Sequence, residues 1–171
     1  MNAYLQSNVP HIYVAGDASG GARLVQTARF EGDAAATNAV LGPARTTPHA
    51  LLPSGGFTDP DIAAVGLTEE KARARDPDCV VATVDYAEVD RAVIDGARGF
   101  LKLIADRHRS LLLGAHAVGD QAVEVIQAVA TAMAAGADIA TLARVEFAYP
   151  SYTAAIGTAA QRLLDAPPTA A

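Results

Sequence analysis

The chain has 171 residues and a formal net charge of −6, and 51% of its residues are hydrophobic. This composition excludes a mainly disordered chain, and the single cysteine, Cys79, excludes a disulfide scaffold. The acidic balance argues against a nucleic-acid partner, which clustered Lys and Arg would bind. No apolar run reaches the roughly 18–20 residues that span a bilayer, and no secretory signal follows Met1. The sequence therefore predicts a cytoplasmic protein with no membrane partner.

The first 42 residues predict a strand, a glycine-rich turn and a helix. An apolar run over 9–16 stops at Gly16-Asp17, which is typical of a buried strand that ends in a turn. After this turn, a spacing of three or four residues predicts a helix that ends near Gly42. One strand and one helix bury too little surface to be stable alone. We therefore expect residues 1–42 to be the C-terminal remnant of a larger α/β domain, in a chain cut upstream of Met1.

Proline and glycine are dense over 43–61, which indicates a linker or domain crossing. A second domain is predicted over 62–165, with strands over 62–66, 80–86, 100–105 and 111–118. Thr68 is expected to cap a helix that reaches Arg75, and residues 87–98 are expected to be irregular. The short charged turn over 106–110 predicts a hairpin between the last two strands.

The remaining residues predict helices. Apolar side chains recur at helical spacing over 122–136 and again over 152–163, and Asp138 begins a short helical turn that reaches Ala143. The tail over 166–171 is expected to be disordered. Strands gathered in the middle and helices toward the end predict an α+β fold, an antiparallel sheet with helices on one face.

The sequence from Pro10 to Asp17 resembles the second flavin motif of the pyridine nucleotide-disulfide oxidoreductases, which include dihydrolipoamide dehydrogenase, glutathione reductase and mercuric reductase. The resemblance continues in order through Glu31-Gly32, 57–69, 99–103, 113–119 and 122–124. It implies that residues 1–42 end an FAD-binding domain and that 62–165 form the dimerisation domain of these FAD/NAD-linked reductases. It also implies a homodimer.

The resemblance implies cofactor-binding roles for five residues. Asp17, after Gly16, matches the aspartate that bonds the ribityl chain of FAD, and the backbone of Leu24 and Val25 is placed beside the flavin ring, with Ala28 behind it. A helix start also favours electron-rich oxygens. On spacing alone, Gly-Asp is an ordinary turn. No G-x-G-x-x-G motif is present, so we expect FAD and NAD(P)H to bind the parent protein and not this chain alone.

Disulfide reductases of this family carry a His-Pro-x-x-x-Glu signature in which the histidine is an acid/base. When this signature is aligned on Pro150, tyrosine (Tyr149) stands at the histidine position and alanine (Ala154) at the glutamate position. This loss argues against dihydrolipoamide or glutathione reduction. Mercuric reductases also lack the histidine and carry tyrosine nearby, but they end in a cysteine pair that this chain lacks. Tyr149 and Tyr152 either gate or stack near the flavin, or pack at a dimer interface.

The other reactive side chains predict no metal site, because no two of the four histidines have ligand spacing. His11 and His116 are expected to be structural, and His49 and His108 solvated. Cys79 has no C-x-x-C partner, so a redox disulfide would lie upstream. Two hypotheses describe the chain, as part of a flavin oxidoreductase or as a non-catalytic dimerisation module. A third, an unrelated small α+β protein, predicts a monomer whose own core includes residues 1–42.

Overall fold

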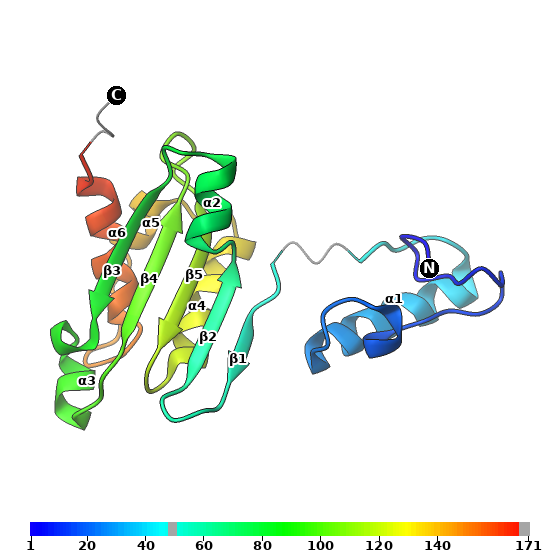
Figure 1. Ribbon diagram of the computed structural model, residues 1–171, viewed down its shortest axis with the longest axis horizontal. Coiled ribbons are helices and arrows are strands. Elements are labelled where there is room, and N and C mark those ends of the chain that lie inside the picture. The colour runs from blue at the N-terminus through cyan, green and yellow to red at the C-terminus, as the bar shows by residue number, and fades with distance from the viewer. Residues whose placement is uncertain (48–50, 168–171) are drawn as a thin grey trace. The chain divides into compact units, whose positions relative to one another are not determined.

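The computed structural model describes residues 1–47 and 51–167, and the chain divides into two units, Met1–Ala50 and Leu51–Ala171 (Figure 1). His49 and the end of the predicted disordered tail lie outside the described residues. Among the described residues, no helix is both long enough and apolar enough to cross a membrane.

The first unit contains a 3-10 turn, η1 (Gly16–Ser19), and one long helix, α1 (Val25–Leu41), as the glycine-rich turn and the helical spacing predicted. The strand predicted over 9–16 is wrong, because the backbone pairs there only through an isolated bridge between Gln6 and Tyr13. A strand needs a partner along its length, and the chain turns back after residue 8 to offer only a short one.

A small core and one buried amide hold the first unit together. Leu5 packs against two alanines of α1, and Tyr13 covers them. Asn38, fully buried on α1, donates from Nδ2 to the carbonyls of Tyr4 (2.9 Å) and Arg45 (2.8 Å). Because its oxygen also accepts from the Arg45 amide at 2.8 Å, the side chain joins both ends of the unit to the helix.

The second unit is an α+β fold built on one antiparallel sheet, as predicted. The strand order is β1-β2-β5-β4-β3 and every neighbouring pair is antiparallel. The predicted hairpin is the β4–β5 pair. The sequence missed β1, which lies within the predicted crossing, because its Ser-Gly-Gly segment has no apolar alternation. The strands are β1 (Ser54–Gly56), β2 (Ile62–Gly66), β3 (Val80–Asp85), β4 (Phe100–Ala105) and β5 (Leu112–Val118).

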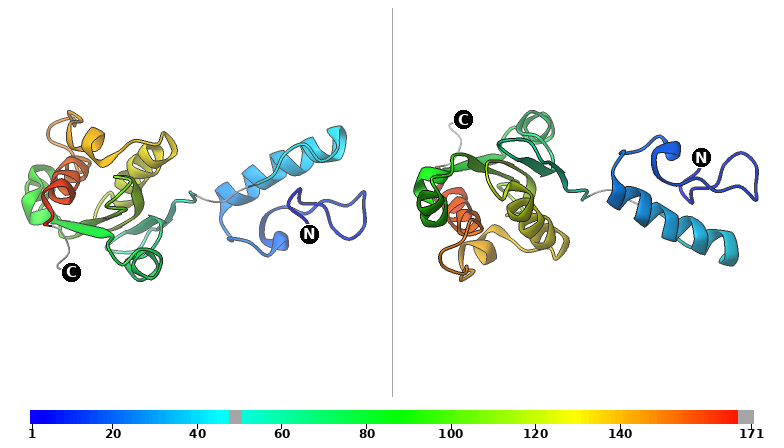
Figure 2. Two further views of the ribbon diagram at one scale, coloured as in Figure 1. Left: turned by 90° about the horizontal axis from the view of Figure 1, so that it is seen from above. Right: turned by 90° about the horizontal axis from the view of Figure 1, so that it is seen from below.

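Helices α4 (Ala122–Ala134), α5 (Ile139–Ala143) and α6 (Ala154–Asp165) lie on one face of the sheet, and α2 (Glu69–Arg75) lies on the other (Figure 2). Alternate strand side chains, such as Leu101 and Leu103, are fully buried in the core, where α6 contacts β3 and β4 and α4 contacts β2 and β5. The stretch expected to be irregular contains a 3-10 turn, η2 (Tyr86–Glu88), and a short helix, α3 (Asp90–Asp95). α3 has only six residues, too few for a periodic pattern to be read.

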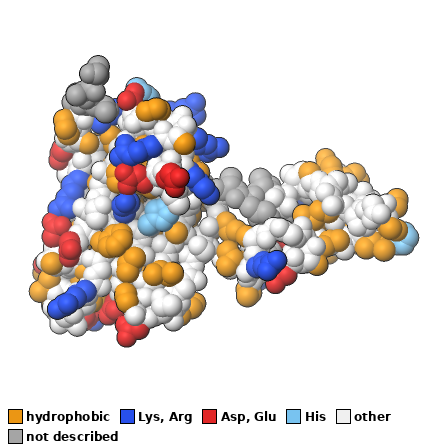
Figure 3. Space-filling model, viewed as in Figure 1, with side chains coloured by type: hydrophobic (Ala, Val, Ile, Leu, Met, Phe, Trp, Pro, Cys, Tyr) orange, Lys and Arg blue, Asp and Glu red, His pale blue; other side chains and the backbone are white. Residues whose placement is uncertain are grey.

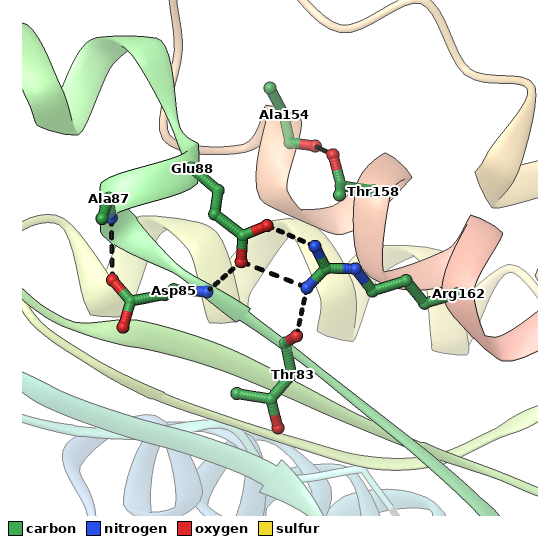
Figure 4. A network of polar contacts seen from close by, with 7 residues as sticks. All are labelled: Thr83, Asp85, Ala87, Glu88, Ala154, Thr158 and Arg162. Carbon is green, nitrogen blue, oxygen red and sulfur yellow. Dashed lines mark hydrogen bonds and ion pairs between the residues drawn. The ribbon is translucent and has the colours of Figure 1, made fainter.

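A polar network fastens α6 to the end of β3 (Figure 4). Arg162 of α6 donates to the backbone carbonyl of Thr83 and forms an ion pair with Glu88. Glu88 also accepts from the amide of Asp85 (3.1 Å), whose side chain accepts from the amide of Ala87 (2.8 Å), which completes a capping box around η2. The Arg162 guanidinium holds the pKa of Glu88 below its usual value.

Candidate functional site

The turn at Gly16-Asp17 is held by a buried carboxylate. Glu31 of α1 is 1% exposed, and its carboxylate accepts from the amide of Gly16 at 2.7 Å and from the hydroxyl of Ser19 at 3.3 Å. These bonds hold the Gly16–Ser19 turn against α1. Glu31 lies one helical turn after Thr27 and Ala28. The sequence identified Glu31 only as part of the family resemblance and gave no sign that it organises the turn.

The five residues predicted to contact a flavin lie together at this turn and the start of α1. Gly16 has a φ of 70°, and a Cβ built on it would lie 3.0 Å from the Cβ of Ala28, so a side chain would crowd the helix. Asp17 is exposed, Leu24 is half-buried and Val25 is 86% exposed. Leu24 is the N-cap of α1 and supplies no side-chain acceptor to the first helical turn. An acidic side chain therefore lies near a helix start that has no side-chain cap.

The second candidate segment, 149–153, presents its two tyrosines differently. Tyr149 is 80% exposed, whereas Tyr152 is 8% exposed and donates from its hydroxyl to Oδ2 of Asp95 at 2.9 Å. The ring of Tyr152 packs against that of Tyr86, with centroids 5.3 Å apart and planes tilted by 55°. Tyr152 is therefore held against the core, whereas the side chain of Tyr149 is open to solvent.

Both tyrosines stay protonated at neutral pH. Burial, then the hydrogen bond to Asp95 and its charge, raise the pKa of Tyr152 to about 12. Interaction with the Asp90 carboxylate, by hydrogen bonding and then by charge, raises the pKa of Tyr149. The pKa of Asp95 is lowered by Arg91 and then by Tyr152. At neutral pH these tyrosines can donate hydrogen bonds, but neither can act as a base.

An open pocket of ≈ 510 Å³ lies beside this segment. Three carboxylates line it, and Gln121 at its edge has a positive φ of 61°, unusual for a residue other than glycine. Tyr86 fixes the loop at this point by donating to the carbonyl of Asp120 at 3.0 Å. The sequence did not single out this pocket, because α3, the β5–α4 turn and the 150–153 segment meet only in the folded chain. The pocket is lined by Arg91, Asp95, Asp120, Gln121, Glu124, Val125 and residues 150–153.

The remaining reactive side chains have structural or solvent-exposed positions. His116 Nε2 lies 3.1 Å from the carbonyl oxygen of Leu67, which supports the structural role expected for it. His11, expected to be structural as part of a strand, is instead exposed in a loop. His108 is exposed, as predicted. Cys79 is buried, and burial raises the pKa of its thiol.

Known proteins that resemble the chain match both units. The family described as pyridine nucleotide-disulphide oxidoreductase, dimerisation domain, matches residues 52–160. Mercuric reductase from Streptomyces lividans is 36% identical over 162 residues, which cover 94% of this chain and 34% of that protein. Dihydrolipoyl dehydrogenase from Halobacterium salinarum is 32% identical over 160 residues, which cover 93% of this chain and 34% of that protein.

Solved structures also match the chain over nearly its whole length. LpdA from Mycobacterium tuberculosis matches with a TM-score of 0.86 and 27% identity, over 95% of this chain and 36% of that one. The HOCl-induced flavoprotein disulfide reductase RclA from Escherichia coli, in its Cu(II) complex, matches with a TM-score of 0.85 and 28% identity, over 95% of this chain and 37% of that one. The chain spans about a third of the length of these relatives. The chain belongs to the pyridine nucleotide-disulphide oxidoreductase family, and its residues 52–160 form the dimerisation domain of that family.

Proposed function

We propose that this chain is the C-terminal part of a homodimeric, FAD-dependent NAD(P)H oxidoreductase. In this proposal the first unit, with limits near 1–42, contributes one edge of the flavin site, and the domain over 62–165 provides the dimer interface. The observation that carries the proposal is the match of the dimerisation domain over 52–160, together with relatives whose similarity extends over both units.

The residues of the first unit fit one edge of a flavin. Asp17 offers an exposed carboxylate to sugar-like hydroxyls, and the start of α1 offers backbone N–H groups to an electron-rich oxygen. Gly16 and Ala28 approach so closely that a larger residue at position 16 would push the turn away from the helix. Bound FAD would supply hydride transfer from NAD(P)H to an acceptor. Because this edge is only part of such a site, we expect no stable FAD binding by the isolated chain.

The segment around Pro150 argues for an acceptor other than a thiol substrate. Tyr149 and Ala154 occupy the positions of the family's histidine and glutamate. Tyr149 holds its proton at neutral pH, because the ordinary tyrosine pKa of 10.0 is raised further by Asp90, so it can position an acceptor by a hydrogen bond but cannot deprotonate a thiol. This favours an acceptor that flavin reduces directly, such as a quinone, a metal ion or a small oxidant.

Apolar side chains left exposed on the second unit support pairing with a second copy. Phe57 is 84% exposed, Ile94 67% and Val93 59%. Hydrophobic side chains also gather over the strands on the face that carries α2 (Figure 3). Exposed apolar surface of this kind is typical of a domain whose surface is covered by another part of the protein or by a second subunit in the assembled enzyme.

Sedimentation velocity tests the pairing directly. We expect a species of twice the 17.5 kDa chain mass, with the dimer weakened by the substitution Ile94→Lys and unchanged by Ile139→Val, a conservative change at a buried position. A monomer at every concentration would refute the dimer, whereas the hypothesis of an unrelated small protein is already excluded by the family match over 52–160.

Cofactor binding separates an enzyme from a non-catalytic dimerisation module. The protein expressed together with its preceding coding sequence is expected to be yellow and to oxidise NAD(P)H. Asp17→Asn is expected to weaken FAD binding, whereas Asp165→Asn, at the far end of the chain, is expected to leave it unchanged. A colourless dimer that does not turn over NAD(P)H would favour the module.

A further inference from the structure

Three metal-ligating side chains meet at one end of the second unit. Asp76 and Asp78 lie in the turn between α2 and β3, and His108 lies in the turn of the β4–β5 hairpin. One ligand atom from each lies within 4.8 Å of the others, and Nε2 of His108 is 3.8 Å from Oδ2 of Asp78. The cluster therefore combines an imidazole with two carboxylates from segments that are distant in the sequence.

Hydrogen bonds of aspartate side chains and of the backbone already hold both turns in place. Oδ1 of Asp76 accepts from the amide of Asp78 at 3.0 Å, and its carbonyl accepts from the amide of Cys79 at 3.1 Å. In the hairpin, Oδ1 of Asp106 accepts from the amide of His108 at 2.8 Å. Since the turns are fixed, a bound ion would need to order little more than the side chains.

Two of the three side chains are open to solvent, and Asp76 is half-buried. The side chain of His108 is 70% exposed and that of Asp78 is 54% exposed. An ion can therefore reach the cluster without any opening of the fold. Bringing the ligand atoms to metal–ligand distances of about 2.0–2.2 Å would require only rotation of these surface side chains.

The donor set selects the class of ion. We propose that Asp76, Asp78 and His108 form a surface site for a borderline divalent transition metal such as Zn²⁺, Ni²⁺ or Co²⁺. Imidazole suits these ions, whereas Ca²⁺ and Mg²⁺ prefer ligand sets made only of oxygen. The nearby sulfur of Cys79 is buried in an apolar cluster with Ala72 and Ile104, so it does not make the site thiolate-rich. Bound metal would join the α2–β3 turn to the hairpin and stabilise this end of the sheet.

Calorimetric titration of the untagged chain with Ni²⁺ and Zn²⁺ tests the site. We expect one ion per chain, and at least a tenfold loss of affinity in His108→Ala and in Asp78→Asn. His11→Ala is the matched control, because His11 is also exposed but belongs to the first unit. Circular dichroism of each variant without metal is expected to equal that of the unchanged chain, because both side chains are on the surface.

Nuclear magnetic resonance locates the ion. Ni²⁺ is expected to broaden amide signals of 76–78 and 106–109 before any others. Broadening centred elsewhere, unchanged affinity in His108→Ala, or no saturable binding of Ni²⁺ and Zn²⁺ would each overturn the proposal. Neither measurement depends on flavin or on dimer formation, so this site and the proposed oxidoreductase function can fail separately.

Discussion

Tyr152 donates a partly buried hydrogen bond to Asp95, and the loss of this bond should be measurable both at neutral and at alkaline pH. The substitution Tyr152→Phe removes only the hydroxyl that donates to Asp95. A hydrogen bond to a charged acceptor contributes about 1.5–3 kcal/mol to folding. Asp95 keeps its ion pair with Arg91 at 2.8 Å and is 28% exposed, so the loss should lie near the lower end. We expect Tyr152→Phe to lower the free energy of unfolding by about 1–1.5 kcal/mol at pH 7.

The pH dependence follows from the raised pKa. Tyr152 has a pKa of about 12 in the folded chain, against 10.0 for an ordinary tyrosine. Above pH 10 the unfolded chain loses a proton that the folded chain keeps, so this contribution to stability is complete below pH 10 and is lost as the pH rises to about 12. The difference between these two pKa values corresponds to about 2.7 kcal/mol in the free energy of unfolding. Tyr86 also has a pKa of about 12, so the unchanged chain loses stability from both groups.

Urea denaturation followed by circular dichroism, at several pH values, measures these changes. The difference between the unchanged chain and Tyr152→Phe isolates the contribution of Tyr152, and it should shrink and then change sign as the pH rises from 10 toward 12. Tyr149→Phe is the control, since Tyr149 is 80% exposed, and it should change stability by less than about 0.5 kcal/mol. A Phe variant with the stability of the unchanged chain at pH 7 and the same alkaline loss would refute the reasoning.

Three further substitutions test the core, a close backbone approach and the turn. Leu103→Ala removes a fully buried side chain of the central sheet and should lower the free energy of unfolding by about 2–5 kcal/mol, measured with urea. Gly66→Ala should destabilise by at least about 2 kcal/mol, because φ is +75° and the new Cβ would lie 2.3 Å from the carbonyl oxygen of Leu113; a thermal midpoint equal to that of the unchanged chain would contradict this. Glu31→Gln should weaken the bond to the Gly16 amide and speed hydrogen exchange there, and unchanged exchange would contradict the role assigned to Glu31.

Local sequence patterns were sufficient for most elements of the second unit. The apolar alternation from Phe100 to Ala105 and the spacing over 122–136 predicted β4 and α4, because each pattern places one apolar face against a core. The short polar turn between β4 and β5 predicted their pairing. The order of all five strands could not be derived this way, since β2 pairs with β5 across a long stretch of chain. β1 and α3 were missed because a Ser-Gly-Gly strand and a six-residue helix have almost no periodicity.

The candidate sites divide in the same way. The sequence by itself determined the family and the Gly16-Asp17 turn before a helix, and it predicts that Tyr149 stands at the family's histidine position. It treated Tyr149 and Tyr152 as a pair, and only the tertiary structure decided that the first is exposed and that the second is buried and hydrogen-bonded to Asp95. Only folding, likewise, brings His108 to Asp78, because the two lie in separate turns. Residue type and spacing are local properties of the chain, whereas burial and convergence depend on contacts between segments that are far apart in it.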